Sequence, residues 1–284
     1  MAVGVARGEV DRAGRKAAGH RLFHRLSRGG LAAKGVVYLL IGWLAVRIGL
    51  GDGGEEADKS GALHTVAEGP GGAVALWLLV VGFAGLALWR FAESAYGQPV
   101  PDGHKATKRL ASFGRGVFYT VSCLAILAFI LGRGTSSSDE QSKEFTARAM
   151  AEPGGRWLVL AVGVGFVAWG LGNIVNALRR KFLEELDTGR MSPRTRTAVK
   201  ALGVVGRSAR GIVFGAVGVF LVHAAVTFDA GKAKGLDGTL REFAGTPAGP
   251  WALVAVALGL VTYGVYAFCE ARWRRIETVR GQGW

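Results

Sequence analysis

The sequence predicts an all-α protein, a polytopic membrane helical bundle of six transmembrane helices. Six apolar runs of about 20 residues alternate with charged segments, and each run is long enough to cross the ~30 Å hydrocarbon core of a bilayer. Hydrophobic residues make up 50% of the 284 residues although the net charge is +14, so apolar and charged residues are segregated along the chain. Glycine, with 45 residues, is about twice as frequent as usual and follows no collagen-like period.

The six predicted spans are, in chain order, residues 31–50, 73–91, 114–131, 157–178, 211–228 and 251–268. The first, third and fifth begin alike, with a basic residue, a glycine, two apolar residues and an aromatic residue. The three motifs are Lys34-Gly35-Val36-Val37-Tyr38, Arg115-Gly116-Val117-Phe118-Tyr119 and Arg210-Gly211-Ile212-Val213-Phe214. Further glycines at helical spacing in the first and fifth spans favour the close approach of another helix.

The second, fourth and sixth spans each follow a turn of proline and small residues. These turns are Pro70-Gly71-Gly72, Pro153-Gly154-Gly155 and Pro247-Ala248-Gly249. Before each turn a short stretch has apolar residues three or four positions apart, the spacing of an amphipathic helix; the stretches are residues 62–67, 145–150 and 239–244. They are too short to cross a bilayer, so we expect helices that lie in its outer interface. The acidic stretch 52–58 and the serine-rich stretch 135–139 are typical of connecting loops.

A constant spacing indicates three copies of one helical hairpin. In each copy the turn proline lies 12 residues before a glycine of the following span, and a polar residue follows 11 residues later. These glycines and polar residues are Gly82 and Glu93, Gly165 and Asn176, and Gly259 and Glu270. All three copies enter the membrane from the same side, so we expect parallel, pseudo-threefold-related repeats around an axis along the membrane normal.

The chain accordingly divides into two tails, three repeats and one basic linker. The predicted boundaries are a basic N-terminal tail (1–27), repeat 1 (28–97), repeat 2 (110–180), a basic linker (181–205), repeat 3 (206–273) and a C-terminal tail (274–284).

The distribution of basic residues predicts the orientation in the membrane. The side that carries both tails holds 23 Lys and Arg residues, against 8 in the three opposite loops. Positively charged segments stay in the cytoplasm, so we expect both termini there. Basic clusters of this size also attract anionic lipid headgroups, and no RNA-binding aromatic motif accompanies them. The expected partners are therefore the lipid bilayer and anionic lipids at the cytoplasmic face, and not nucleic acid.

The basic-glycine-aromatic helix start, the short loop helix and the proline-glycine entry into the second helix resemble a known membrane-protein family. The family is domain of unknown function 1206, found mainly in actinobacteria and built from tandem two-helix repeats. The resemblance covers about residues 28–273. It implies a multi-pass protein of the bacterial plasma membrane, and it implies no activity, cofactor or catalytic residue.

Within a hairpin, the start of the first helix and the end of the second should meet on the cytoplasmic side. Charges close to hydrocarbon are tolerated when they are paired or reach water. The pairs so expected are Lys34 with Glu93, Arg115 with the neutral Asn176, and Arg210 with Glu270. Alternatively, the basic side chains extend to the lipid headgroups without a partner.

A second group of polar residues lies deeper in the predicted spans. Arg47 and His223 each follow the basic residue of their motif by 13 positions, and Asn173 and Asn176 lie one helical turn apart. They could line a path for an anion or a proton. The alternative is that Arg47 extends to the headgroups and the other three hydrogen-bond to neighbouring helices. The aromatic residues Trp169 and Tyr263 occupy equivalent positions, where we expect core packing.

Motifs of enzymatic chemistry are absent from the sequence. The histidines and cysteines have no metal-ligand spacing, and the glycine-rich stretches lack the strand-turn-helix context of a phosphate-binding loop. The sequence therefore predicts a non-enzymatic protein without cofactor or metal, with a structural, interaction or lipid-binding role. The alternative is a small transporter or channel for a small solute or anion.

Overall fold

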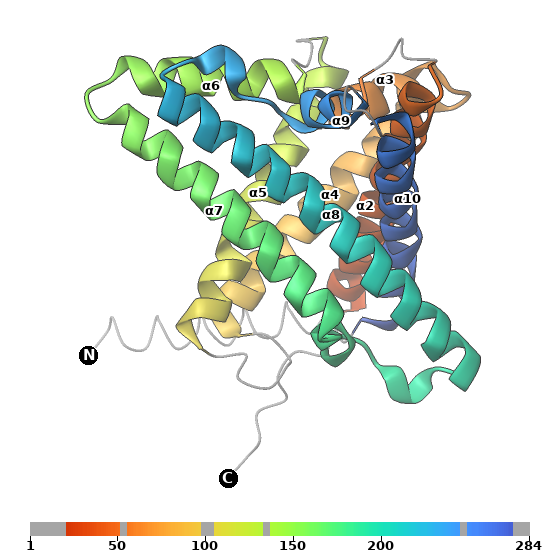
Figure 1. Cartoon of the computed structure of the whole chain (residues 1–284). Coiled ribbons are helices and arrows are strands. Elements are labelled where there is room, and N and C mark those ends of the chain that lie inside the picture. Colours follow the sequence, from red (N-terminus) through yellow and green to blue (C-terminus); the bar gives the residue numbers. More distant parts are fainter. Residues whose placement is uncertain (1–20, 52–55, 98–104, 133–136, 245–248, 275–284) are drawn as a thin grey trace, which may run out of the picture.

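The computed structural model describes residues 21–51, 56–97, 105–132, 137–244 and 249–274. Within them, six helices are long and apolar enough to cross a membrane. These are α2 (Arg21–Gly49), α4 (Gly72–Tyr96), α5 (Ala106–Ile130), α7 (Gly155–Leu178), α8 (Pro193–Thr227) and α10 (Gly249–Trp273). They coincide with the six predicted spans and confirm the all-α membrane bundle (Figure 1).

Three shorter helices lie across one end of the bundle (Figure 1). They are α3 (Lys59–Glu68), α6 (Ser138–Ala151) and α9 (Leu236–Ala244), and they confirm the three predicted loop helices. The α3 helix begins after Asp58, whose carboxylate accepts the N–H groups of Ser60 and Gly61, as an N-cap residue does. We call this end of the bundle the loop-helix end, and the opposite end, where α4 connects to α5 and α7 to α8, the linker end.

The helices at the linker end extend beyond the predicted spans. The segment expected as a linker, residues 181–205, contains two 3₁₀ helices, η1 (Lys181–Glu185) and η2 (Thr188–Arg190), and the first turns of α8. Ser192 caps α8 through the N–H of Thr195, and Pro193 occupies its first turn, where proline is well tolerated. The predicted tails, residues 1–27 and 274–284, lie mostly outside the described residues.

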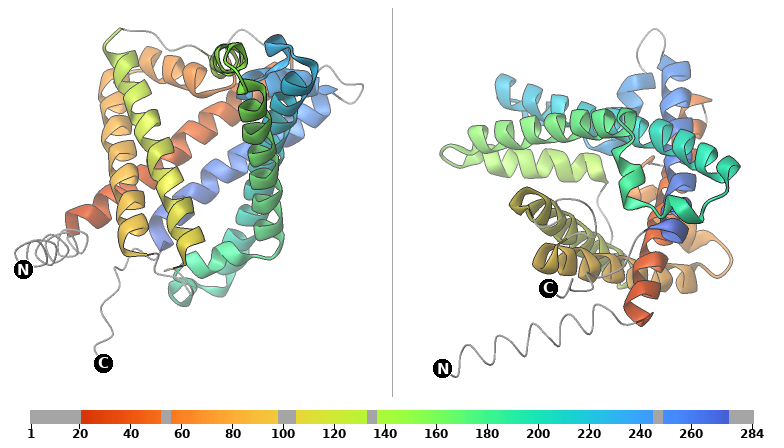
Figure 2. Two further views of the ribbon diagram at one scale, coloured as in Figure 1. Left: turned by 90° about the vertical axis from the view of Figure 1, so that its left-hand side faces the viewer. Right: turned by 90° about the horizontal axis from the view of Figure 1, so that it is seen from below.

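The tightest helix pairs form between repeats and not within them. The second helix of each repeat packs along the first helix of the next: α4 against α5, α7 against α8, and α10 back against α2 (Figure 2). The glycines of the helix starts make these contacts close. A Cβ atom added at Gly42 would lie 2.8 Å from the backbone nitrogen of Val261, and one at Gly211 would lie 2.8 Å from the carbonyl oxygen of Gly170. This confirms the expected close packing at the glycines.

The loop helices explain this arrangement. In repeat 1, α3 adds ten residues that lie across the loop-helix end of the bundle (Figure 1), a displacement of about 15 Å. The second helix therefore starts well away from the end of the first. The second helix of each repeat lies instead beside the first helix of another repeat.

The threefold relation is broken in repeat 2. In repeats 1 and 3 the two helices of a repeat also touch, with Gly82 of α4 against Ala33 and Gly259 of α10 against Ala209. The equivalent residues in repeat 2, Gly165 of α7 and Gly114 of α5, have no atom within 4 Å of an added Cβ. The helices α5 and α7 scarcely touch and stand apart (Figure 2), and only 22% and 17% of their apolar windows are buried, against 44–50% for the other four spans.

Carboxylate-to-backbone hydrogen bonds join the three loop segments in a ring at the loop-helix end. Asp58 Oδ2 accepts the N–H of Ser138 (2.6 Å). Asp139 and Asp237 continue the ring by accepting the N–H groups of Gly235 (3.1 Å) and Ala57 (2.8 Å). Each repeat is thus bonded to the next and the third to the first. Residues 138–139, expected in a loop, form the first turn of α6, while Asp58 lies in the connecting segment just before α3. Asp58 is only 1% exposed.

Candidate functional site

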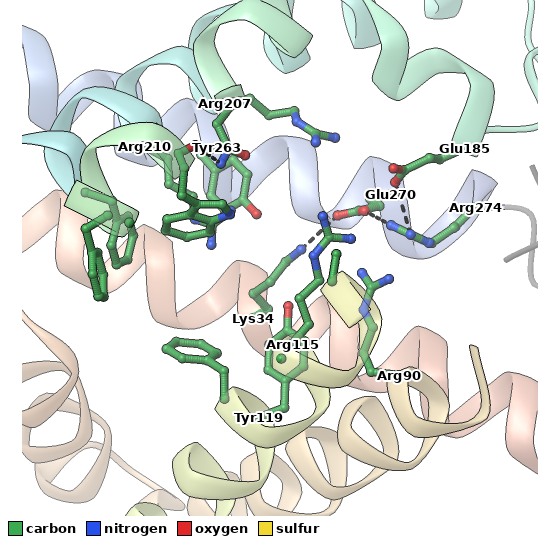
Figure 3. A pocket seen from close by; sticks show the side chains of 18 of the residues that line it. Lys34, Arg90, Arg115, Tyr119, Glu185, Arg207, Arg210, Tyr263, Glu270 and Arg274 are labelled. Atoms are coloured by element: carbon green, nitrogen blue, oxygen red, sulfur yellow. Dashed lines mark hydrogen bonds and ion pairs between the residues drawn. The ribbon is translucent and has the colours of Figure 1, made fainter. Parts of the chain in front are cut away.

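A cavity of about 520 Å³ lies inside the bundle, in the half nearer the linker end. This volume is typical of small-molecule sites. Its lining comes from all six spans and from η1 (Figure 3). The lining residues are Lys34, Arg90, Ala111, Gly114, Arg115, Phe118, Tyr119, Val162, Gly165, Phe166, Trp169, Asn173, Glu185, Arg207, Arg210, Phe214, Tyr263, Glu270 and Arg274.

The charged residues of this lining are mostly basic. Six of the described lining residues are Lys or Arg, against two glutamates. They come from four different spans, α2, α4, α5 and α8, and from the residue that follows α10. In Figure 3 Lys34 and Arg274 reach Glu270, whereas Arg210 lies beside Tyr263. Charge of one sign in a cleft with walls of low dielectric constant attracts counter-ions strongly.

One part of this charge is balanced by an ion-pair network around Glu270. Lys34 Nζ donates to Glu270 Oε2 (2.8 Å), and Arg274 Nη1 donates to Glu270 Oε1. Arg274 Nη2 also lies 3.0 Å from Glu185 Oε2. Burial would raise the pKa of Glu185, but the guanidinium groups of Arg274, Arg207 and Arg115 together lower it to about 2. Glu185 is therefore a carboxylate at any physiological pH.

A second balanced part is the Arg90–Glu93 pair of α4. Arg90 Nη1 donates to Glu93 Oε2 (2.6 Å), and Ser112 Oγ of α5 donates to the same oxygen (3.2 Å). Both charged residues are buried. Arg90 Nε has no hydrogen-bond partner among the described residues, so even this pair leaves one donor unsatisfied.

The remaining basic groups have no carboxylate partner. Among the described residues, no glutamate or aspartate forms an ion pair with Arg115, Arg207 or Arg210. Arg115 forms no hydrogen bond within the described part of the chain. A charge that lacks an ion-pair partner in a region of low dielectric constant costs free energy. Arg115, Arg207 and Arg210 are only partly exposed, so an anion or water in the cavity would stabilise them.

Arg210 is held by aromatic side chains. Its Nε donates to Tyr38 Oη (2.9 Å), and its guanidinium lies over the rings of Tyr38, Trp169, Phe214 and Tyr263 at centroid distances of 4.9–5.6 Å. Rings at these distances favour a cation without neutralising it. The guanidinium is therefore fixed in position and keeps its full charge for an anion.

The predicted pairs are wrong in their partners. Lys34 pairs with Glu270 and not with Glu93, because α2 packs along α10 of the third repeat. Arg210 hydrogen-bonds to Tyr38 and not to Glu270. Correspondingly, Glu93 pairs with Arg90 of its own helix. Arg115 and Asn176 are not joined by a contact either, since Asn176 is exposed and does not line the cavity.

The predicted polar path is not assembled. Asn173 lines the cavity, but its Nδ2 donates to the carbonyl of Trp169 in its own helix (2.8 Å). His223 is exposed and Arg47 lies over the ring of Trp43, with a centroid distance of 5.1 Å. Neither lines the cavity, because both lie near the loop-helix end of their helices, away from the cationic region.

Sequence reasoning missed three of the six basic lining residues, Arg90, Arg207 and Arg274. Glu185 and Arg274 lay in segments expected as linker and tail, Arg207 lay in repeat 3 just before the fifth predicted span, and Arg90 is buried within the bundle. One signal was available in the sequence: Arg207 and Arg210 lie three residues apart and therefore share a helix face. Trp169 lines the cavity and is 38% exposed, so it does not pack in the core as expected.

Comparison with known proteins places this architecture in a family. A family model described as Domain of Unknown Function (DUF1206) matches residues 29–97, 110–180 and 205–274. The Uncharacterized protein YxxB of Bacillus subtilis (strain 168) is similar to the chain, with 33% identity over 249 residues, or 87% of this chain and 89% of the relative. No solved structure matches the chain. With three matched segments on three structural repeats, the chain belongs to the Domain of Unknown Function (DUF1206) family of membrane proteins.

Proposed function

We propose that this integral membrane protein is a non-enzymatic binding protein that holds an anionic group, a phosphate or a carboxylate, in the cavity of its bundle. The observation that carries the proposal is the set of three guanidinium groups without a carboxylate partner, Arg115, Arg207 and Arg210. Guanidinium groups bind planar anions through paired, charge-assisted hydrogen bonds. Basic pockets between transmembrane helices are a known way of holding anionic headgroups.

The aromatic and phenolic groups of the cavity support the same ligand class. The hydroxyl-bearing side chains of Tyr119 and Tyr263 line the cavity beside the basic groups. Phenol hydroxyls donate hydrogen bonds to anions without adding charge. The two lining glutamates are both paired with basic residues, so they do not oppose the binding of an anion at Arg115 or Arg210.

The alternative function, a transporter or channel for a small solute or anion, has less support. Channels select ions with polar or charged groups that line the pore. Arg47 and His223, the residues predicted for its outer part, do not line the cavity. The loop helices and their ring of hydrogen bonds also lie across the loop-helix end. A binding site that is closed toward one membrane face fits these observations better.

For the anion site, we expect stabilisation by phosphate-bearing ligands that depends on Arg115. Phosphatidic acid or inorganic phosphate should raise the melting temperature of the detergent-solubilised protein, because a ligand of the native state stabilises it. Arg115→Gln should weaken the affinity for these ligands about tenfold, the loss of one charge-assisted hydrogen bond, so that a correspondingly higher ligand concentration is needed for the same rise in melting temperature. Without ligand the same variant should be as stable as the wild type or more stable, since an uncompensated charge is removed.

The matched control is Arg194→Gln, which removes the same charge from an exposed position at the start of α8. It should leave the ligand effect unchanged. The proposal is wrong if both variants alter the effect equally, or if neither phosphatidic acid nor phosphate stabilises the wild type.

We also propose that the protein lies in a bacterial plasma membrane with its linker end and both termini in the cytoplasm. The support is the excess of Lys and Arg on that side, since positively charged segments stay in the cytoplasm. In a variant without Cys123 and Cys269, a membrane-impermeant maleimide should label Glu144→Cys in α6 on intact cells. Arg190→Cys in η2 should react only after permeabilisation. Both positions are exposed, so the reverse labelling pattern would refute this orientation.

A further inference from the structure

The two ends of the bundle offer little access to the cavity. At the loop-helix end, α3, α6 and α9 are bonded into the Asp58–Asp139–Asp237 ring. At the linker end, the segment with η1 and η2 is held to the end of α10, where the N–H of Asp187 donates to the carbonyl of Trp273 (2.8 Å). The Phe182 ring of η1 is 1% exposed. The side of the bundle remains as a route of entry.

The seam between α5 and α7 is the place where the side is open. Gly114 on α5 and Gly165 on α7 both line the cavity and are both exposed, with open space where a Cβ would be. The equivalent pairs in the other two repeats, Gly82 with Ala33 and Gly259 with Ala209, are in tight contact. The opening is therefore a specific departure of repeat 2 from the packing that its sister repeats share.

The lining of the cavity is apolar at this seam and basic in its depth. Phe118 on α5 and Trp169 on α7 line the cavity and are 48% and 38% exposed. Lys34 and Glu270 at the other wall are 6% and 4% exposed. In a bilayer an apolar mouth faces hydrocarbon, while the basic depth is complementary in charge to an anion.

We propose that the cavity binds an anionic amphiphile, a phosphate or carboxylate group carried on hydrocarbon chains, which enters sideways from the bilayer through the seam between α5 and α7. This inference rests on the proposed function, because it assigns the molecule that carries the anionic group. The headgroup lies among Arg115, Arg207 and Arg210, and the chains leave between Phe118 and Trp169 into the membrane. A free anion would satisfy the basic groups but would leave the apolar mouth without an occupant.

The experiment is native mass spectrometry of the full chain released from phosphatidylcholine nanodiscs that contain phosphatidic acid. Glycerol 3-phosphate, the same headgroup without chains, is the competing probe. We expect one phosphatidic acid per chain in the wild type, and no displacement by glycerol 3-phosphate. Gly165→Leu places a side chain in the open seam and should reduce the retained lipid at least tenfold, as should Arg115→Gln.

The matched control is Gly172→Leu, the same change on the same helix at a position that has open space and does not line the cavity. It should retain the lipid as the wild type does. Gly114→Leu fills the seam from the α5 side and serves as a second variant if Gly165→Leu does not fold. Equal melting temperatures of the leucine variants and the wild type establish that the seam variants are folded.

The outcomes separate this inference from the proposed function. Retention of lipid by both seam variants, together with its loss in Arg115→Gln, would refute entry through the seam and leave the anion site standing. Binding of glycerol 3-phosphate as tight as that of phosphatidic acid would refute the amphiphile and again leave the anion site standing. Equal retention by Arg115→Gln and the wild type would refute both proposals.

Discussion

Replacing Glu270 by glutamine is expected to lower the free energy of unfolding by about 3–5 kcal/mol, the cost of breaking a buried ion pair from one side. The Glu270 carboxylate is the shared partner of Lys34 and Arg274, and all three residues are buried. The glutamine would leave the buried Lys34 without a carboxylate partner and Arg274 with Glu185 alone, in a region that already has an excess of positive charge. Reversible unfolding in mixed micelles measures the change.

A double-mutant cycle on the same groups tests which helices are neighbours. Lys34→Gln combined with Glu270→Gln should show a coupling energy of at least about 1 kcal/mol, the range of contacting charged residues. Lys34→Gln combined with Glu93→Gln should be additive, since the hydrogen bond of Lys34 goes to α10. Glu144→Gln, which breaks the exposed pair with Arg148, is the control, with an expected change below about 0.5 kcal/mol. Coupling of Lys34 to Glu93 would contradict the packing between repeats.

Replacing Asp58 by alanine is expected to destabilise the protein by about 2–4 kcal/mol. Its carboxylate accepts three backbone N–H groups, those of Ser60, Gly61 and Ser138, and it is buried. Loss of an N-cap costs about 1 kcal/mol, and a buried N–H left without a partner adds about 1–3 kcal/mol. Thermal unfolding of the purified variant measures the total.

Asp229→Ala is the matched control for this prediction. Asp229 also caps a helix, η3 (Ala230–Lys232), through the N–H of Gly231 (2.9 Å), but it is exposed and does not bond to another repeat. Its loss should cost less than about 1 kcal/mol. Hydrogen exchange should show opening of α6 as well as α3 in Asp58→Ala, because the carboxylate joins both segments. If the variant opens α3 alone, the ring does not couple the repeats.

The cationic cavity could be predicted from the sequence only in part. Three of its basic residues, Lys34, Arg115 and Arg210, are each the first residue of one copy of the repeated motif. Their common position in the repeat places them at one height in a threefold bundle. Glu185 could not be assigned to the same site, because it lies between the second and third repeats, and Arg274 could not because it follows the end of the sixth predicted span.

The sequence by itself determined the six spans, the three loop helices and the parallel threefold repeat, since hydrophobic length and constant spacing are properties of the chain alone. It did not determine which copies touch. Glu270 stands in the same repeat position as Glu93, so either could pair with Lys34 by spacing. Only the tertiary structure decided between them, because the loop helices displace the second helix of each repeat toward the next repeat. The same packing closed two seams around Gly82 and Gly259 and left the third, at Gly165, open.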